Sequence, residues 1–362
     1  MTTNEIISPD SPRLAELSAQ LSDMANTLQG SGDWPRRQLE LCAEYGVFRW
    51  FVAQDQGGLG WDDADVVRGY LDLSAACLTT TFVLTQRTGA CRRIANSENV
   101  ALKQKLLPDL LSGRTFATVG ISHLTTSRQH LKKPVLLAEE EEGGFRLTGY
   151  SPWVTGATAS DTLVVGASLE DGRQMLLAVP TRTEGVEIGA PAELVGLSAS
   201  QTGPINFHGV LAPAEWLLDG PRENVMAKGK GANTGGLETS TLAIGLSTAA
   251  YRFLREQRAK RDELSQPTEH FQAELEQLRA DLLAAASGNP DDDPQCNPLQ
   301  IRSRANSLVL RVTQAALTSA KGAGYLQSHP VGRWCREALF FLVWSCPTGV
   351  LSANLCELAR IE

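Results

Sequence analysis

The chain has 362 residues, 42 % of them hydrophobic and 20 % charged, with a formal net charge of −8. This length is too great for one small core and predicts two or three modules. The acidic balance argues against a nucleic-acid-binding protein, which would normally carry a basic face. No stretch approaches the ~20 apolar residues that a membrane-spanning helix needs, and the first residues lack the basic end and apolar run of a signal peptide.

Seven cysteines are scattered along the chain without a Cys-x-x-Cys motif. This spacing indicates neither a disulfide framework nor a zinc site, and it fits reduced thiols in a cytoplasm. We therefore expect a cytoplasmic protein that has no metal site.

The first part of the chain, from residue 11 to about residue 111, has the pattern of helices. Ser11-Pro12 and Asp33-Trp34-Pro35 are start signals, because each combines a capping side chain with a proline whose missing N–H is harmless in the first turn. The glycines of Gln54–Gly60 predict a tight turn. Further helices are expected over 62–76, 79–94 and 98–111, and Pro108 is expected to kink or end the last of them.

From Phe116 to about Leu218 the sequence predicts strands instead. Asp171-Gly172 between two apolar runs is a hairpin signal. Strands spaced this closely, with no helix-length stretch between them, favour an antiparallel sandwich or barrel. The β-type runs are 116–121, 135–138, 145–150, 162–169, 175–179, 185–188 and 204–210.

The last part of the chain returns to helices. Phe271, Leu275, Leu278, Leu282 and Ala285 step by four, three, four and three, which is one stripe of an amphipathic helix. Together with helices expected over 299–320, 332–344 and 348–359, this predicts a four-helix bundle. The glycine-rich segment 226–236 lacks the Gly-Lys-Ser/Thr ending of a phosphate loop, so we expect a flexible surface connection there. The predicted domains are a helical domain over 1–113, a β domain over 114–222 and a bundle over 223–362.

The stretch Phe145–Thr155 is the best candidate for a functional site. Phe145 and Leu147 alternate with polar residues, as in a strand with one buried face. After a Gly-Tyr-Ser-Pro corner come Trp153 and Thr155, an indole on which a flat ring could stack and a hydroxyl that could donate a hydrogen bond. Taken alone, the stretch fits a sheet corner with a core tryptophan better than a ligand site.

Helices, a β module and a bundle, in this order, resemble the layout of the acyl-CoA dehydrogenase family. The resemblance extends over about 300 residues and rests on several short motifs in the family's order. These are the Gly-Gly-Leu-Gly turn at 57–60, Leu-Pro-Asp-Leu-Leu-Ser-Gly at 107–113, Gly149–Thr155, the segment 212–218, Arg261 with Gln272, Lys-Gly-Ala-Gly-Tyr at 321–325, Pro330-Val331 and Arg336-Glu337-Ala338.

The resemblance implies that FAD lies between the β module and the bundle, with Trp153 beside the flavin ring and the Thr155 hydroxyl near its reactive edge. It also implies a homodimer or homotetramer, because some residues would reach the cofactor of a neighbouring subunit. Arg261 suits a pyrophosphate, whose oxygens its planar guanidinium can meet in pairs. Arg261 could instead be a solvated charge at a helix end, and Gly322 and Gly324 could be ordinary helix C-caps. The implied cofactor-binding residues are Ile121, Ser122, Ser127, Trp153, Thr155, Arg261, Gln272, Gly322 and Gly324.

The sequence departs from the family at the catalytic base. The family removes an α-proton with a glutamate in a Tyr-Glu-Gly-Thr turn, and counting without a gap from Pro330-Val331 puts Ser345 at that position. An unassisted serine hydroxyl is too weak a base for this step. Glu238 resembles an alternative base on the first bundle helix, although it lies three residues after the expected position, nearly one helical turn. Glu238 could equally be a carboxylate that the helix dipole favours at a helix start.

Three hypotheses follow from this pattern. The first is an FAD-dependent oxidoreductase that dehydrogenates an acyl thioester such as an acyl-CoA, with Glu238 and Ser345 as the catalytic candidates. The second is a flavin-dependent monooxygenase that uses reduced flavin and oxygen and needs no base for an α-proton. The third is a scaffold of the same fold without catalysis. The expected partner is a small-molecule substrate, with no nucleic acid and no membrane.

Overall fold

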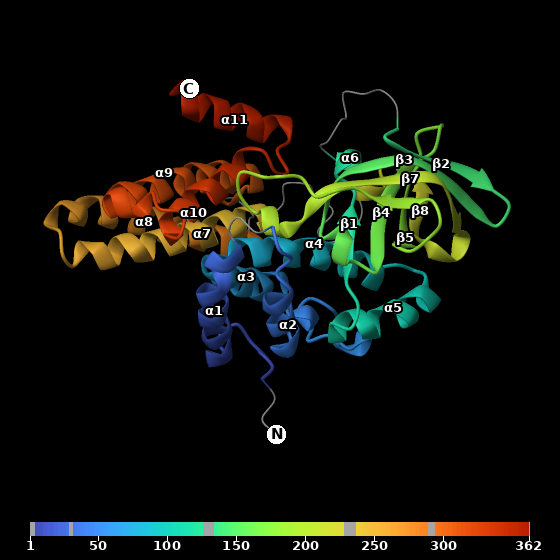
Figure 1. Cartoon of the computed structure of the whole chain (residues 1–362), viewed down its shortest axis with the longest axis horizontal. Helices are drawn as coiled ribbons and strands as arrows, with labels where there is room; N and C mark the ends of the chain where they lie inside the picture. The colour runs from blue at the N-terminus through green and yellow to red at the C-terminus, as the bar shows by residue number, and fades with distance from the viewer. Residues whose placement is uncertain (1–3, 29–31, 126–133, 228–236, 289–293, 362) are drawn as a thin grey trace.

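The computed structural model describes residues 4–28, 32–125, 134–227, 237–288 and 294–361. Figure 1 shows an elongated molecule in which the sheet occupies one end and the long C-terminal helices the other. The N-terminal helices lie against both. The segments 126–133 and most of 226–236 fall outside the described residues, and with them Ser127.

The N-terminal part consists of α1 (Pro12–Ala25), α2 (Arg36–Glu44), α3 (Asp63–Ala76), α4 (Leu78–Ala95) and α5 (Val100–Ser112). The predicted start at Ser11-Pro12 is confirmed, since the Ser11 side chain accepts from the backbone N–H of Arg13. The expectation for Pro108 is wrong in one respect, because α5 continues through it to Ser112. Leu107, Leu110 and Leu111 are buried in one hydrophobic cluster, and this packing holds the turn in helical form despite the lost hydrogen bond.

The β part is one eight-stranded sheet with the order β6-β7-β3-β2-β4-β5-β8, and β1 pairs with β4. Its pairs are antiparallel except β1–β4 and β2–β4, which are parallel. The hairpin at Asp171-Gly172 is confirmed between β4 and β5, and Gly172 has the positive φ of 88° that such a turn requires. The strands are β1 (Ala117–Gly120), β2 (Leu136–Glu141), β3 (Gly144–Thr155), β4 (Thr162–Ser168), β5 (Gln174–Pro180), β6 (Val186–Ile188), β7 (Thr202–Pro213) and β8 (Leu217–Arg222).

Alternating residues of the central strands enter two different cores. Val164 of β4 belongs to a cluster with Ile94 of α4 and Leu107 of α5, so these helices cover one face of the sheet. Its neighbours Leu163 and Val165 belong to a second cluster formed by the strands themselves. This period of two explains why β4 carries no polar side chain between Leu163 and Ala167.

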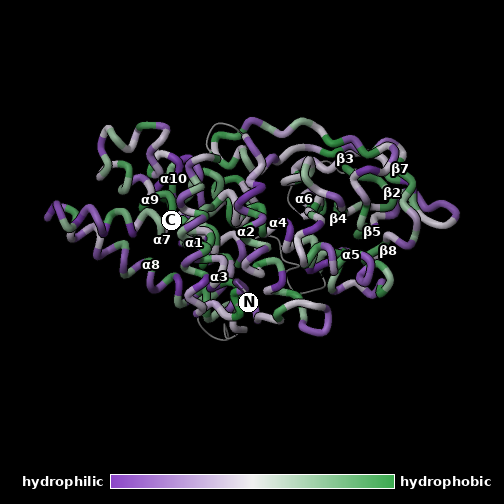
Figure 2. The backbone as a smooth tube through the Cα atoms, turned by 60° about the horizontal axis from the view of Figure 1, so that its bottom comes forward, coloured by the Kyte–Doolittle hydropathy of each residue, from purple (hydrophilic) through white to green (hydrophobic). Residues whose placement is uncertain are grey.

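The C-terminal part consists of α7 (Leu237–Arg258), α8 (Ser265–Ala286), α9 (Pro298–Gly324), α10 (Pro330–Ala338) and α11 (Thr348–Ala359). Figure 2 shows hydrophilic and hydrophobic segments alternating along α8, as its predicted stripe requires. The helix predicted over 332–344 is shorter, because α10 ends at Ala338 and a 3-10 turn, Leu339–Leu342, follows. α11 lies apart from α7, α8 and α10 and contacts α9 (Figure 1).

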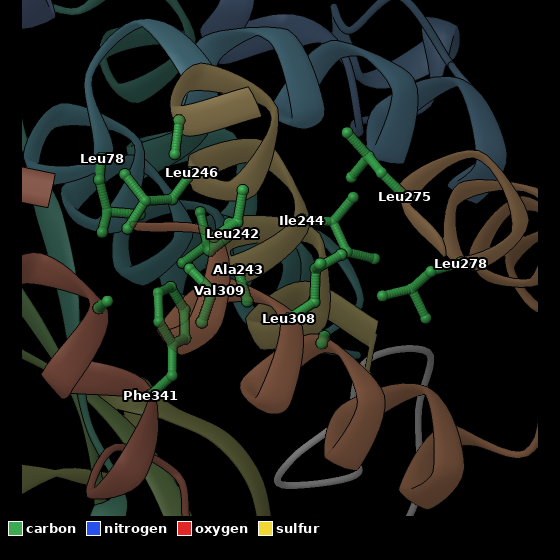
Figure 3. Packing of buried hydrophobic residues seen from close by; sticks show 14 of the residues in the cluster. Leu78, Leu242, Ala243, Ile244, Leu246, Leu275, Leu278, Leu308, Val309 and Phe341 are labelled. Atoms are coloured by element: carbon green, nitrogen blue, oxygen red, sulfur yellow. The ribbon is translucent and has the colours of Figure 1, made fainter. Parts of the chain in front are cut away.

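One large hydrophobic cluster joins the bundle to the N-terminal helices. It contains Leu71 of α3 and Leu78 and Phe82 of α4, together with residues of α7, α8 and α9. In Figure 3, Leu78, Leu242, Val309 and Phe341 point toward one another. Among the described helices, none combines the length and the apolar character needed to cross a membrane.

Candidate active site

A cavity of about 1200 Å³ opens where the three parts of the molecule meet. Residues of α3 and α4 form one wall, and residues around β1, β3 and β7 form another. The third wall comes from the start of α7, the start of α9 and the segment that joins α10 to α11. Segments distant in the sequence therefore surround a single space.

The β part presents an indole and a hydroxyl to this cavity. Trp153 of β3 lines it and is 44 % exposed, whereas the next residue, Val154, is fully buried in the sheet's inner core. Ile121 and Ser122 line the cavity beyond the end of β1. The Ser122 hydroxyl is buried and has no hydrogen-bond partner, so it is available to a ligand.

Thr155, predicted to meet a cofactor, does not lie on the cavity wall. Its Oγ1 is 2.8 Å from Oγ1 of Thr202, and Thr202 Oγ1 is 2.9 Å from Oγ of Ser200. Thr202 does line the cavity. Sequence reasoning missed Thr202, because only the pairing of β3 with β7 sets it opposite Thr155.

The wall formed by α4 and α7 is charged. Arg92 lies between two carboxylates, with Nη2 3.2 Å from Oδ1 of Asp63 and Nη1 3.8 Å from Oε1 of Glu238. Asp63 and Glu238 are the carboxylates found among the described residues that line the cavity. Arg93 also lines it, and desolvation lowers the pKa of this guanidinium. The candidate base Glu238 therefore lies at the cavity with its side chain 48 % exposed.

The wall formed by the C-terminal helices carries Ser345, the residue that the count along the sequence puts at the position of the family's glutamate, and a cation, Arg302. Ser345 lines the cavity and has a positive φ of 43°. Arg302 of α9 also lines it and is 0 % exposed. Its Nη2 donates to the carbonyl of Trp344 at 2.9 Å and to that of Phe341 at 3.3 Å, which fixes the segment that bears Ser345.

Burial lowers the pKa of Arg302 to about 10, and Cys346 opposes this shift. Arg302 therefore keeps its charge at neutral pH. Sequence reasoning missed this residue. Its spacing was the available signal. Arg302 lies three residues before Ala305 and seven before Val309, both fully buried, so all three lie on one face of the helix.

The remaining predicted cofactor residues lie away from the cavity. Arg261 donates from Nη2 to Oε1 of Gln257 at 2.8 Å and lines a smaller hollow of about 320 Å³ that it shares with Lys321. Gln272 is half-buried on α8. The end of α9 holds Gly322, whose Cβ position is open, and Gly324, which is buried. This placement is compatible with contacts to another subunit, and these contacts stay a prediction.

His123 follows β1 and is buried. Its Nε2 lies 2.7 Å from the carbonyl oxygen of Gly166, whereas Nδ1 has no partner. Desolvation lowers the pKa of His123, so the ring stays neutral at neutral pH.

Comparison with known proteins agrees with this architecture. Residues 15–114 match the family described as acyl-CoA dehydrogenase, N-terminal domain. The probable acyl-CoA dehydrogenase YngJ of Bacillus subtilis is 23 % identical over 338 residues, which cover 88 % of each chain. These findings indicate the acyl-CoA dehydrogenase family.

Solved structures of this fold extend over almost the whole chain. Butyryl-CoA dehydrogenase from Megasphaera elsdenii superposes with a TM-score of 0.81 at 18 % identity, covering 96 % of this chain and 97 % of that one. KijD3, solved in complex with FMN and a dTDP-linked amino sugar, superposes with a TM-score of 0.78 at 20 % identity, covering 97 % and 93 %. The predicted fold class is thereby confirmed.

Proposed function

We propose that this protein is an FAD-dependent oxidoreductase whose flavin ring lies in the 1200 Å³ cavity beside Trp153. The observation that carries the proposal is an open space between the β part and the bundle with a tryptophan indole exposed on its wall. A core tryptophan would be covered by neighbouring side chains, whereas this indole can stack on a planar ring.

The residues on the β side fit such a group. Ser122 provides a buried hydroxyl that has no partner, and Thr202 a second hydroxyl at the wall. The cavity exceeds the ~300–1000 Å³ common for small-ligand pockets, which leaves room for a cofactor together with a substrate. Bound FAD would supply a two-electron acceptor for a hydride. The relative from Megasphaera elsdenii is by name a butyryl-CoA dehydrogenase, which supports an acyl-CoA as the substrate here.

Glu238 is the proposed base for the α-proton of the acyl group. Of the two carboxylates on the described wall, Asp63 lies closer to Arg92, at 3.2 Å against 3.8 Å for Glu238. Glu238 therefore has more freedom to accept a proton from a substrate. Ser345 would contribute a hydrogen bond at the opposite wall rather than act as a base.

A second subunit would complete the cofactor site. Arg261 and Lys321 share a cationic hollow at the outer end of the bundle, and this charge suits a pyrophosphate. Gln272, Gly322 and Gly324 are proposed to contact the same cofactor, which makes a homodimer or homotetramer the functional form.

One observation favours a flavin-dependent monooxygenase as the alternative. The wall that should bear the family's base has Ser345 and the cation Arg302 instead. A neighbour of the same fold, KijD3, is by its title bound to FMN and an amino-sugar nucleotide rather than to an acyl-CoA. The open cavity argues against the third hypothesis, a scaffold without a ligand site.

The deciding experiment adds acyl-CoAs, with and without a free carboxylate on the acyl chain, to the purified protein without oxygen and records the flavin absorbance. We expect the absorbance to bleach, because the substrate transfers a hydride in the absence of any other oxidant. A protein that bleaches only with a separate reductase, and then forms product in an oxygen-dependent step, would instead be the monooxygenase.

A further inference from the structure

Arg302 is a buried cation that has no carboxylate partner among the described residues. Its hydrogen bonds go to neutral acceptors, namely the Asn306 side chain at 3.0 Å and the carbonyls of Phe341 and Trp344. Its third nitrogen, Nη1, is buried and has no hydrogen-bond partner within the described ranges of the chain. Two other arginines of α9 differ, since Arg304 pairs with Asp281 and Arg311 with Glu274.

An uncompensated charge in a protein interior is unfavourable, and buried charges are normally paired. Arg87 is also buried without a carboxylate partner among the described residues. Its guanidinium lies against the ring of Phe48, 3.5 Å from the centroid, so packing within the fold is enough to explain its burial. Arg302 differs from Arg87 because it lines the large cavity. The position of the missing negative charge is therefore open to a ligand.

The surroundings of Arg302 make this wall selective for an anion. On this wall Leu299, Phe340 and Trp344 are apolar, and the polar lining residues besides Arg302 are Asn297, Arg336 and Ser345, none of which is acidic. Both carboxylates of the described wall lie beside Arg92, on the α4 and α7 side. In such apolar surroundings a cation attracts an anionic oxygen more strongly than in water.

We propose that Arg302 binds a carboxylate of the substrate, so that the enzyme acts on an acyl chain that carries a second, free acid group. A carboxylate oxygen would accept a charge-assisted hydrogen bond from Nη1. The inference depends on the proposed function in one respect, namely that this cavity holds the substrate.

The test compares pentanoate with pentanamide, two probes of the same shape that differ in charge. Isothermal titration calorimetry on the purified protein, with the cofactor it carries, measures both dissociation constants. We expect wild-type protein to bind pentanoate at least about tenfold more tightly than pentanamide, as a hydrogen bond to a charged group implies. Arg302→Met should abolish this preference, and Arg302→Lys should retain part of it.

Two control variants separate recognition from folding. Asn306→Ala removes a hydrogen bond of Arg302 and should lower the melting temperature while the preference for pentanoate persists. Arg93→Met removes another cation of the cavity and should also leave the preference intact. If Arg302→Met does not fold, the wild-type preference and its partial retention in Arg302→Lys decide the question.

Three results would overturn the proposal: no preference in wild-type protein, a preference that survives in Arg302→Met, or a preference lost only in Arg93→Met. If Arg302→Met instead lowers the flavin content while wild-type protein shows no preference, the cofactor supplies the anion. Flavin absorbance of the same samples reports on the proposed function separately, because a colourless protein can still prefer pentanoate.

Discussion

Trp153 and Thr155 are two residues apart in β3 but have different surroundings. Regular alternation would place both side chains on one face of the strand. The register between β3 and β7 shifts between Ser151 and Val154, so the strand is irregular at this point. As a result Trp153 faces the cavity and Thr155 bonds to Thr202. The sequence predicted a strand followed by a corner at 149–152, whereas β3 continues through Thr155 with a shift of register that depends on the partner strand.

Replacement of Trp153 by alanine should weaken FAD binding. Loss of an aromatic stacking contact of about 0.5–1.5 kcal/mol corresponds to roughly 2- to 13-fold in affinity. Equilibrium titration of the cofactor-free protein with FAD measures the change, and Trp153→Phe should recover most of the affinity. Equal affinities in all three proteins would show that the indole does not contact the ring.

Replacement of Glu238 by glutamine should slow flavin reduction by an acyl-CoA by about 10²-fold or more, the usual contribution of a general base. Stopped-flow absorbance without oxygen measures this rate. Asp63→Asn is the matched control, because it also removes a carboxylate beside Arg92 and should have a much smaller effect. Reduction at the wild-type rate in Glu238→Gln would exclude Glu238 as the base.

His123 should make the protein less stable in mild acid. Burial lowers its pKa below the ordinary value of 6.5, so the unfolded chain binds a proton at a higher pH than the folded chain does. The free energy of unfolding therefore falls as the pH drops below about 6.5, by at most about 1.4 kcal/mol per pH unit from this residue. Urea titrations of wild-type protein and His123→Gln at several pH values test this, and parallel curves would contradict it.

At the scale of elements, strong periodic patterns predicted the structure well. The stripe of α8 is confirmed because Phe271, Leu275, Leu278 and Leu282 are buried in the bundle core. The end of α10 was not predicted, because the apolar run 338–344 continues a helical pattern without a stop signal. Its 3-10 turn is held instead by Arg302 and Asn306 from α9, which donate to the carbonyl of Phe341. Hydrogen bonds from α9 therefore help to determine where α10 ends.

The close packing of α3 against α7 should depend on Gly245. A Cβ at this position would lie 2.5 Å from Cβ of Ser74 and 2.8 Å from the carbonyl oxygen of Leu71. Gly245→Ala should force the helices apart and lower the free energy of unfolding by about 1–3 kcal/mol, as other overpacked cores do.

Gly349→Ala in α11 is the matched control for Gly245→Ala. A Cβ there would meet Leu299 at an ordinary 3.7 Å, so stability should be unchanged or slightly higher. Thermal unfolding of both variants measures the difference. A Gly245→Ala protein as stable as Gly349→Ala would show that the two helices are less closely packed.

At the scale of the whole molecule, the parts share their cores. The largest hydrophobic cluster includes α3 and α4 of the N-terminal part and the helices of the bundle. Because the parts share a core, the predicted domain boundary after residue 113 stays a prediction. The cavity lies where these parts meet, and the sequence therefore indicated only some of its lining residues. Trp153 and Ser122 belong to recognisable local motifs, whereas Arg302 and Thr202 reach the cavity through contacts between distant segments.

The central claim is that a flavin occupies the cavity between the β part and the bundle. The most direct measurement is the amount of FAD bound per chain, from absorbance and from chromatography of the cofactor released on denaturation. We predict about one FAD per chain in protein that is as purified or reconstituted with added FAD. A well-folded protein that stays colourless after incubation with excess FAD would contradict the claim.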